Sequence, residues 1–434
     1  MFYKETNFIF NHQEKRICIK YVELKYLLEL LTIIFLRGDL SMASKLDKII
    51  YQTLFKNLFS DTCKVRFWDG EEVKFGDGEI RFTVVLNEPI PQKDILTNPS
   101  IAFGEAYMYK KVDIEGNVRE VIESMQNNRN SFLGAPEKYE NLIKPLKNTR
   151  SGSKKNISFH YDIGNDFYKL WLDKSMTYSC AYFRSGEDTL EQAQKNKIEY
   201  TLKKLNMQEG DTLLDIGCGW GEVIIAAAKK YKVKALGITL SKEQKQAAEE
   251  RIKAENLGDY VQVELCDYRE MKGRHFDRIV SIGMLEHVGN EYLKEYFSII
   301  DKLLKEGGIS LVQSITGVKD GGYDPWIEKY IFPGGYLPSM AEIVANIGGE
   351  KFHLLDMESL RRHYGKTLEK WADNFEKALP QIRENKDETF IRMWRLYLNS
   401  CAASFNTGMI DIHQFLFSKG NDDGIHWTRD YLYR

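Results

Sequence analysis

The sequence predicts an α/β fold in which a doubly wound, mostly parallel, Rossmann-like sheet follows a small N-terminal α+β domain. From residue 190 onward, five apolar runs with the character of strands alternate with segments long enough for crossover helices: DTLLDIG, KALGITL, VQVELCD, FDRIVSIG and GISLVQSI. A glycine-rich turn, GCGWG at 217–221, directly follows the first of these runs. This combination favours a ligand site at the turn.

The first 41 residues resemble neither a membrane span nor a signal peptide. The apolar run at 26–36 is shorter than the ~20 residues that cross a bilayer, and it contains Glu29. No small-residue cleavage site follows it. We expect residues 1–41 to be a start-site artefact or an extension, and an amphipathic helix to begin at Met42.

The rest of the chain divides by composition into three segments. Their expected bounds are 42–133 for the N-terminal domain, which we expect to be associated with lipid or membrane, 134–157 for a polar, basic linker and 158–434 for the α/β catalytic domain. Within the first segment, the pairs Asp69-Gly70 and Asp77-Gly78 predict hairpin turns. A helix near 116–126 is expected to close this small domain.

Composition excludes several kinds of function. A formal net charge of −2 over 434 residues provides no overall field to attract nucleic acid, so any attraction to a membrane must be local. The six cysteines show no paired CxxC spacing, and we expect neither a zinc site nor a disulfide framework. Such sparse cysteines indicate a reducing, cytoplasmic compartment.

Three glycines stand at alternate positions in the turn after the first predicted strand. Gly217, Gly219 and Gly221 let the backbone approach a ligand, and the helix that follows presents free N–H groups. Asp215 is expected to orient this loop, and Asp267 after the third strand can meet an adenine amino group. The alternative is a tight turn with nothing bound.

These positions resemble those at which a class I S-adenosylmethionine-dependent methyltransferase binds its cofactor. The acidic residue usual after the second strand is absent, and we expect Thr239 and Gln244 to make the polar contacts there. The residues expected to bind S-adenosylmethionine are Tyr178, Ser179, Asp215, Gly217, Cys218, Gly219, Gly221, Thr239, Leu240, Gln244, Asp267, Tyr268 and Arg269.

Seven motifs occur in an order that resembles a known enzyme family. They are HYDIGNDFYKLWLD (160–173), TYSCAYF (177–183), LDIGCGWGE (214–222), GITLSKEQ (237–244), DYRE (267–270), VSIGMLEHVG (280–289) and WIEKYIFPGGYLPS (326–339). From about residue 45 to the C-terminus, the chain is similar to the cyclopropane-fatty-acid-phospholipid synthases and the related mycolic acid cyclopropane synthases.

The resemblance implies a reaction on unsaturated phospholipid acyl chains. The methyl of S-adenosylmethionine is transferred to a cis double bond, a carbocation forms, and a bound bicarbonate removes a proton to close the ring. Such a cation needs an apolar, aromatic tunnel that excludes water. The candidate rings, of which we expect about half to line the tunnel and the rest to be core, are Tyr161, Phe167, Tyr168, Tyr178, Tyr182, Phe183, Tyr330, Phe332, Tyr336, Trp371 and Phe375.

The resemblance also implies a bicarbonate site. Cys180 corresponds to a residue whose main chain meets the anion, Glu286 to a carboxylate that accepts from its hydroxyl, Ile315 to a backbone N–H donor and Tyr364 to a hydroxyl donor. The structural alternatives are a buried small residue at Cys180, an exposed helix-start glutamate at Glu286 and a helix-surface tyrosine at Tyr364.

Two further positions complete the expected catalytic set. Gln313 stands where many family members have a histidine, and its amide can donate to an anion but cannot titrate. Cys401 aligns with another family cysteine, and we expect it to be structural because methyl transfer to an alkene needs no enzyme nucleophile.

Two other functions remain open at this point. A lipid C-methyltransferase that makes methyl-branched fatty acids would share every cofactor residue, and a catalytically silent lipid-binding homologue is suggested by Gln313. We expect no nucleic-acid partner. We expect instead a cytoplasmic protein that forms a homodimer and binds reversibly to the inner face of the cell membrane through its basic linker. The alternative is that this linker is simply solvated.

Overall fold

The computed structural model describes residues 40–134, 163–318, 321–421 and 424–433. The chain divides into two compact units after Leu58. The first unit contributes helix α2 (Leu40–Lys56), which confirms the helix predicted from Met42. Most of the expected extension and of the expected basic linker, namely residues 1–39 and 135–157, lies outside the described residues.

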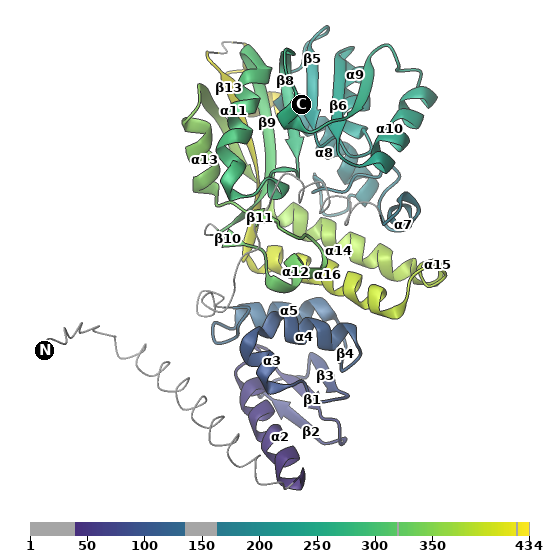
Figure 1. Cartoon of the computed structure of the whole chain (residues 1–434), viewed down its shortest axis with the longest axis vertical. Coiled ribbons are helices and arrows are strands. Elements are labelled where there is room, and N and C mark those ends of the chain that lie inside the picture. The colour runs from purple at the N-terminus through teal and green to yellow at the C-terminus, as the bar shows by residue number, and fades with distance from the viewer. Residues whose placement is uncertain (1–39, 135–162, 319–320, 422–423, 434) are drawn as a thin grey trace, which may run out of the picture. The chain divides into compact units, whose positions relative to one another are not determined.

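The second unit begins with a four-stranded sheet in the order β2-β1-β3-β4 (Figure 1). Its strands are β1 (Cys63–Arg66), β2 (Glu72–Phe75), β3 (Phe82–Leu86) and β4 (Val112–Glu115), and its helices are α3 (Gln92–Thr97), α4 (Pro99–Met108) and α5 (Val118–Asn127). Helix α5 confirms the closing helix, and its Gln126 donates to Ser404 Oγ at 2.8 Å.

Only one of the two predicted hairpins is present. Asp69-Gly70 lies between β1 and β2, which pair antiparallel. The hairpin predicted at Asp77-Gly78 is wrong, because the strand that follows, β3, pairs in parallel with β1. Strand β3 is almost wholly buried and takes a central position, whereas the exposed β2 stays at the edge.

A seven-stranded sheet in the order β12-β13-β9-β8-β5-β6-β7 forms the centre of the rest of the unit. Its strands are β5 (Thr212–Ile216), β6 (Lys234–Thr239), β7 (Val261–Leu265), β8 (Phe276–Ile282), β9 (Leu304–Gly317), β12 (Phe352–Ser359) and β13 (Ile410–Lys419). Strands β5 to β9 are parallel, and β13 runs antiparallel between β9 and β12. The predicted doubly wound sheet is therefore confirmed.

Helices cover both faces of this sheet (Figure 1). One face carries α8 (Leu190–Lys204), α9 (Glu222–Tyr231) and α10 (Lys242–Ala254), and the other carries α11 (Leu293–Leu303) and α13 (Met340–Gly348). Each layer of helices packs on its own apolar core. Leu213 lies in the core beside α8, α9 and α10, and its neighbour Leu214 lies in the core beside α11 and α13, because successive side chains of a strand point to opposite faces.

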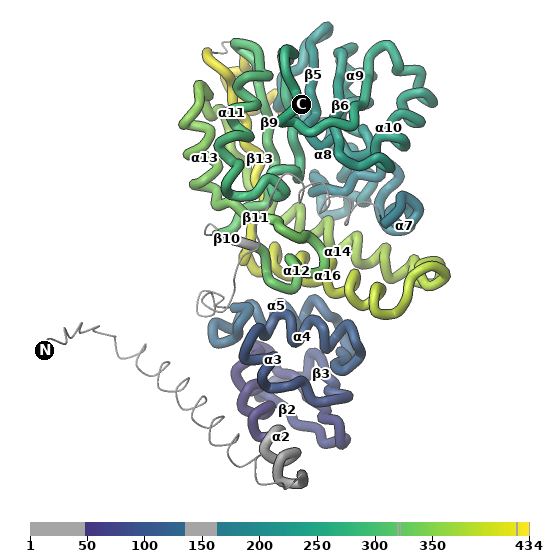
Figure 2. The backbone as a smooth tube through the Cα atoms, in the orientation of Figure 1, coloured from purple at the N-terminus to yellow at the C-terminus, as the bar shows by residue number. Residues whose placement is uncertain are grey.

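A third apolar core, the aromatic cluster, is built mainly from helices that are not part of these two layers. They are α7 (Asn165–Lys169), α12 (Pro325–Tyr330), α14 (Arg361–Lys377), α15 (Leu379–Ile382) and α16 (Glu388–Thr407). Helices α14 and α16 run side by side (Figure 2). The remaining short elements are η3 (Tyr268–Glu270), η4 (Leu285–His287), η5 (Asn290–Tyr292), β10 (Gly321–Gly322), β11 (Tyr336–Leu337) and η6 (Arg429–Leu432).

Candidate active site

The turn between β5 and α9 is pinned to the neighbouring strand. The backbone N–H groups of Gly217 and Cys218 both donate to the carbonyl of Ile238, at 2.9 and 3.0 Å. Gly217 has a φ of +83°, and a Cβ there would lie 2.9 Å from Met284 Cγ. Both the left-handed backbone and the close approach therefore require glycine at this position.

A cavity, here called the glycine-loop cavity, opens beside this turn. It is lined by all but one of the predicted cofactor residues: Tyr178, Ser179, Asp215, Gly217, Cys218, Gly219, Thr239, Leu240, Gln244, Asp267, Tyr268 and Arg269. The exception is Gly221, which precedes α9 with a φ of +84° and lies against α10, where a Cβ would stand 3.2 Å from that of Ala248. Gly221 thus serves the turn and the packing of α10.

Thr239 and Gln244 meet each other at the cavity wall. Thr239 Oγ1 donates to Gln244 Oε1 at 2.8 Å and accepts from the Ser241 N–H at 3.1 Å. The Gln244 N–H in turn lies 3.3 Å from Ser241 Oγ, which caps α10. Because Gln244 Oε1 accepts the bond from Thr239, the NH₂ group of the same amide is the end that can donate a hydrogen bond to a ligand.

The charge of Asp267 is balanced by Arg269, which lies in the short helix η3 that follows it. Its Oδ1 accepts from Arg269 N and Nε at 3.0 and 2.9 Å, and its Oδ2 lies 2.5 Å from an Arg269 guanidinium nitrogen. These bonds raise the pKa of Arg269. Asp267 and Arg269 therefore line the cavity as a rigid ion pair.

Asp215 faces a buried cation that sequence reasoning missed. Burial raises the pKa of Asp215 to about 7, and the charge of Lys197 opposes this shift. Lys197 also lines the cavity, is 2% exposed and donates to Ser179 Oγ at 3.2 Å. Burial lowers the pKa of its ammonium to about 8. The sequence feature that could have revealed the burial of Lys197 is its helical spacing from Ala193 and Tyr200, which lie on the same buried stripe of α8.

Arg251 of α10 is a second residue that the sequence did not reveal. Its guanidinium donates to the carbonyl oxygens of Trp220 and Ser175, at 2.8 and 3.2 Å, and pairs with Glu222. Trp220, Ser175 and Glu222 all line the cavity. Arg251 therefore ties the glycine turn to the segment that carries Tyr178.

Glu286 is buried beside β9. Its side chain is 3% exposed, so the alternative of an exposed helix-start glutamate is wrong. Oε1 accepts from the Ile315 N–H at 2.7 Å, so this N–H is engaged by the carboxylate. Oε2 is buried and has no hydrogen-bond partner among the residues that the structure describes. Burial raises the pKa of Glu286 to about 7.

A path of direct contacts joins Ile315 to two other catalytic candidates. Ile315 in β9 pairs with Ile412 in β13, and the Ile412 carbonyl accepts from Leu360 N–H at 2.8 Å. The Leu360 carbonyl then accepts from Tyr364 N–H at 3.0 Å and lies 3.9 Å from Cys180 Sγ. Tyr364 is partly buried against the aromatic cluster. The backbones of β9, β13 and the start of α14 thus link Glu286 to these three predicted residues.

Gln313 and Cys401 complete the set. Gln313 is 1% exposed, and its Oε1 accepts from Gln414 Nε2 at 3.0 Å. Cys401 on α16 packs against the aromatic cluster, and burial raises its pKa to about 12. Burial also raises the pKa of Cys180. Both thiols are thus protonated at neutral pH, which fits structural rather than nucleophilic roles.

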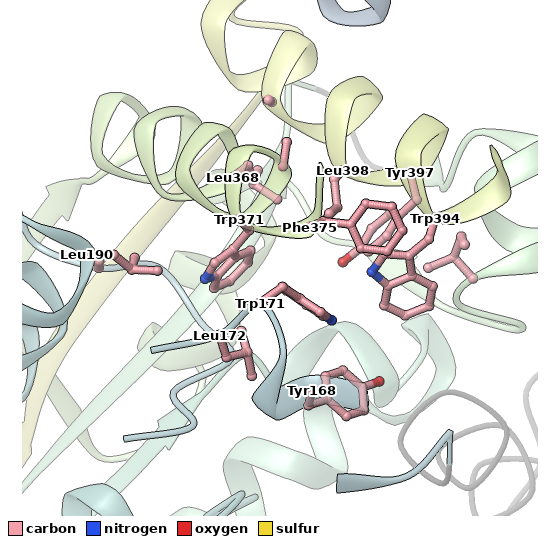
Figure 3. Close-up of a cluster of buried hydrophobic side chains, with 14 of the residues drawn as sticks. Tyr168, Trp171, Leu172, Leu190, Leu368, Trp371, Phe375, Trp394, Tyr397 and Leu398 are labelled. Atoms are coloured by element: carbon pink, nitrogen blue, oxygen red, sulfur yellow. The ribbon is translucent and has the colours of Figure 1, made fainter. Parts of the chain in front are cut away.

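Figure 3 shows part of the aromatic cluster, including Tyr168, Trp171 and Trp371. Met176, Tyr178 and Trp220 belong to the cluster and also line the cavity. Of the predicted tunnel rings, Tyr161 lies outside the described residues and Tyr336 packs on a different core. The others join the cluster: Phe167, Tyr168, Tyr178, Tyr182, Phe183, Tyr330, Phe332, Trp371 and Phe375.

Between residues 40 and 433, outside the gaps in the description, no three His, Cys, Asp or Glu side chains are grouped so as to hold a metal ion. No helix in those same ranges is long and apolar enough to cross a membrane.

The sheet order, the glycine turn and the cavity beside it define a class I S-adenosylmethionine-dependent methyltransferase. Residues 148–415 match the family model of mycolic acid cyclopropane synthetase, and residues 50–137 match a domain of unknown function. The chain belongs to the mycolic acid cyclopropane synthetase family.

Relatives within and around this family extend the comparison. A probable fatty acid methyltransferase of Pseudomonas putida is 39% identical over 384 residues, which is 86% of this chain and 96% of the relative. The cyclopropane-fatty-acyl-phospholipid synthase of Escherichia coli K12 is 42% identical over 62% of this chain and 69% of its own length. The mycolic acid cyclopropane synthase CmaA1, solved with SAH and CTAB, has a TM-score of 0.58 at 36% identity, covering 63% of this chain and 99% of that one.

Proposed function

We propose that the protein adds a methylene group across the cis double bond of unsaturated phospholipid acyl chains, forming cyclopropane fatty acids. The E. coli relative is named for this activity on acyl phospholipids. The observation that carries the proposal is the buried Glu286 carboxylate, with one oxygen bound by Ile315 N–H and the other unpartnered in the described chain. A buried carboxylate of this kind can accept a hydrogen bond from a reacting group that is out of contact with water.

The glycine-loop cavity fits S-adenosylmethionine, which supplies the methyl group when bound. At Gly219, with a φ of +54°, a Cβ would meet no atom within 4 Å, so the backbone is bare on the side of the cavity. Thr239 and Gln244 would orient the nucleoside end, with Asp267 near the adenine amino group. Lys197 and Ser179 supply an ammonium and a hydroxyl for the carboxylate of the methionine end.

The aromatic cluster would shelter the positive carbon. Trp171, Trp371 and Phe375 are each 0% exposed, and the rings of Tyr178 and Trp371 lie 5.1 Å apart. Ring faces attract a cation, and a site without water prevents its capture as an alcohol. Tyr178, which also lines the cavity, would bring this surface next to the methyl donor.

Bicarbonate, when bound, would accept the proton that closes the ring. Glu286 Oε2 is a buried acceptor that needs a donor, and Gln313 Nε2 is a buried donor that needs an acceptor. A bicarbonate ion offers both a hydroxyl and acceptor oxygens, so these two groups fit it. The Cys180 main chain and the Tyr364 hydroxyl would complete the site, while Ile315 N–H orients the Glu286 carboxylate.

Fatty-acid analysis of cells that express the chain from Met42 tests the proposal. We expect a cyclopropane fatty acid, identified by the NMR signals of its ring protons, and a loss of orders of magnitude with Glu286→Gln. Cells with wild-type protein that is abundant and binds the cofactor, but with no ring-bearing acid, would contradict the proposal.

Methyl-branched fatty acids are the second candidate product. The P. putida relative, which aligns with most of this chain, is named a probable fatty acid methyltransferase. The two products can be isomers, so chromatography or NMR must separate them. A third outcome, no transfer of labelled methyl to unsaturated vesicles despite intact cofactor binding, would favour a silent lipid-binding homologue with Gln313 as its altered position.

Access to the lipid is part of the proposal. The protein would bind reversibly to the inner face of the cell membrane from the cytoplasm, as a homodimer, with its basic linker near anionic headgroups. Each lysine or arginine near such a surface contributes about 1 kcal/mol at low salt. Sedimentation with anionic vesicles should therefore weaken as salt rises, and binding that ignores salt would refute this part.

A further inference from the structure

Two glutamine side chains face each other across β9 and β13. Gln313 and Gln414 are register partners in the antiparallel pair, and each is 1% exposed. Gln414 Nε2 donates to Gln313 Oε1 at 3.0 Å. Neither glutamine lines the glycine-loop cavity.

The pair leaves a donor, Gln313 Nε2, and an acceptor, Gln414 Oε1, without partners among the described residues. Gln313 Nε2 is buried and makes no hydrogen bond within the described ranges. Glu286 Oε2, whose partner oxygen is bound two residues along β9, is a buried acceptor that also lacks a partner in the described residues. An unsatisfied buried polar group costs about 1–3 kcal/mol, and two of opposite kind are satisfied together by one ligand that carries both an oxygen acceptor and an O–H donor.

The backbone of β9 anchors both groups. Gln313 and Ile315 are two residues apart, so their side chains point to the same face, with Cα atoms about 7 Å apart. Ile315 N–H holds Glu286, and Gly283 N–H, three residues before Glu286, donates to the Gln313 carbonyl at 3.0 Å. Both the donor and the acceptor are therefore fixed to the same stretch of β9.

We infer that Gln414 is a positioning residue: by donating to Gln313 Oε1, it turns the Gln313 NH₂ group toward the hydroxylated oxyanion that Glu286 also holds. This inference rests on the bicarbonate site proposed above. Without Gln414, the Gln313 amide would be free to rotate and to present its oxygen to an anion. With it, a neutral donor that does not titrate faces the anion.

The sharpest test replaces the donor by an acceptor of the same size. In Gln414→Glu, the carboxylate cannot donate and instead accepts from Gln313 Nε2, which reverses the Gln313 amide. Gln414→Leu removes the donor without offering an acceptor. Rates are measured in carbonate-free buffer with added bicarbonate, together with SAH binding by calorimetry. Ser310→Ala, a buried hydroxyl on β9 without a partner in the described residues, is the matched control.

We expect Gln414→Glu to raise the half-saturating bicarbonate concentration at least tenfold and Gln414→Leu to raise it less, with SAH binding and the KM for S-adenosylmethionine within twofold of wild type. Adding Gln313→His to Gln414→Glu should recover part of the loss, because an imidazole can donate to the carboxylate and still face the anion. Ser310→Ala should behave as wild type.

Unchanged bicarbonate dependence in both Gln414 variants would overturn the inference and leave the proposed function standing. Gln414→Glu equal to wild type alongside a weakened Gln414→Leu would also overturn it, since the Gln313 amide would then already point the other way. A wild-type rate that does not respond to bicarbonate would overturn the proton acceptor of the proposed function, and this inference with it. SAH binding shows for each variant that the fold is intact.

Discussion

Glu286→Gln should stabilise the fold at alkaline pH while it abolishes activity. Burial raises the pKa of Glu286 from 4.5 to about 7. The native state therefore binds an extra proton between these values, and wild-type stability falls as pH rises through this window. The neutral amide carries no such penalty. The free energy of unfolding of the variant, relative to wild type, should thus increase by about 2–3 kcal/mol from pH 5 to pH 8.

Urea denaturation in bicarbonate-free buffer at several pH values between 5 and 8 measures this difference. Subtracting wild type from variant at each pH cancels the other titrating groups, including Asp215. Glu88→Gln is the control, because the Glu88 side chain is 64% exposed and its carboxylate stays solvated. Stability curves for Glu286→Gln and wild type that run parallel from pH 5 to 8 would refute the reasoning that this carboxylate is desolvated.

Three further predictions concern the glycine turn, the buried lysine and the aromatic cluster. Gly217→Ala should destabilise the protein by about 1–3 kcal/mol and weaken SAH binding, and Gly210→Ala, with a φ of +87° and no atom near the added Cβ, should cost less by urea denaturation. In calorimetry, SAH affinity of wild type should fall as pH rises through about 8, where Lys197 loses its charge, whereas Lys197→Met should bind about tenfold more weakly at pH 7 with no such dependence. Trp171→Ala, at a residue that is 0% exposed, should lower the free energy of unfolding by about 3–5 kcal/mol, against at most about 0.5 for Trp427→Ala at a fully exposed residue. Equal losses of stability for Gly217→Ala and Gly210→Ala, or for Trp171→Ala and Trp427→Ala, would contradict the reasons given for those pairs. An SAH affinity of Lys197→Met that depends on pH would contradict the role given to Lys197.

Much of the cofactor cavity was predictable from short stretches of the chain. Asp215 and the turn that follows it depend on the backbone of a few consecutive residues, and Gly217, Gly219 and Gly221 all have a positive φ, which favours glycine. Strand periodicity then places the ends of neighbouring parallel strands side by side, which is why Thr239 and Asp267 were expected at the same cavity.

The failures have equally physical causes. The pair Asp77-Gly78 carries the local signature of a hairpin, but burial of the apolar strand β3 decided which strands pair. Lys197 is a charged residue in a polar stretch of helix, and its spacing on the buried stripe of α8 did not outweigh its charge until the fold placed it against the cavity. In both cases the structure depends on residues that are close in space but distant in the sequence, and the local pattern does not contain them.

Local chemistry in the chain was therefore enough for the fold class, the segments that form the parallel strands and most of the cofactor cavity, because periodicity and glycine conformation act over a few residues. The pairing of Gln313 with Gln414, 101 residues apart, and the bond from Ile315 N–H to Glu286 exist only in the folded sheet. Contacts between distant segments depend on register and burial, and these arise when the whole core packs together. The direction of a buried amide and the elevated pKa of a buried carboxylate are consequences of that packing.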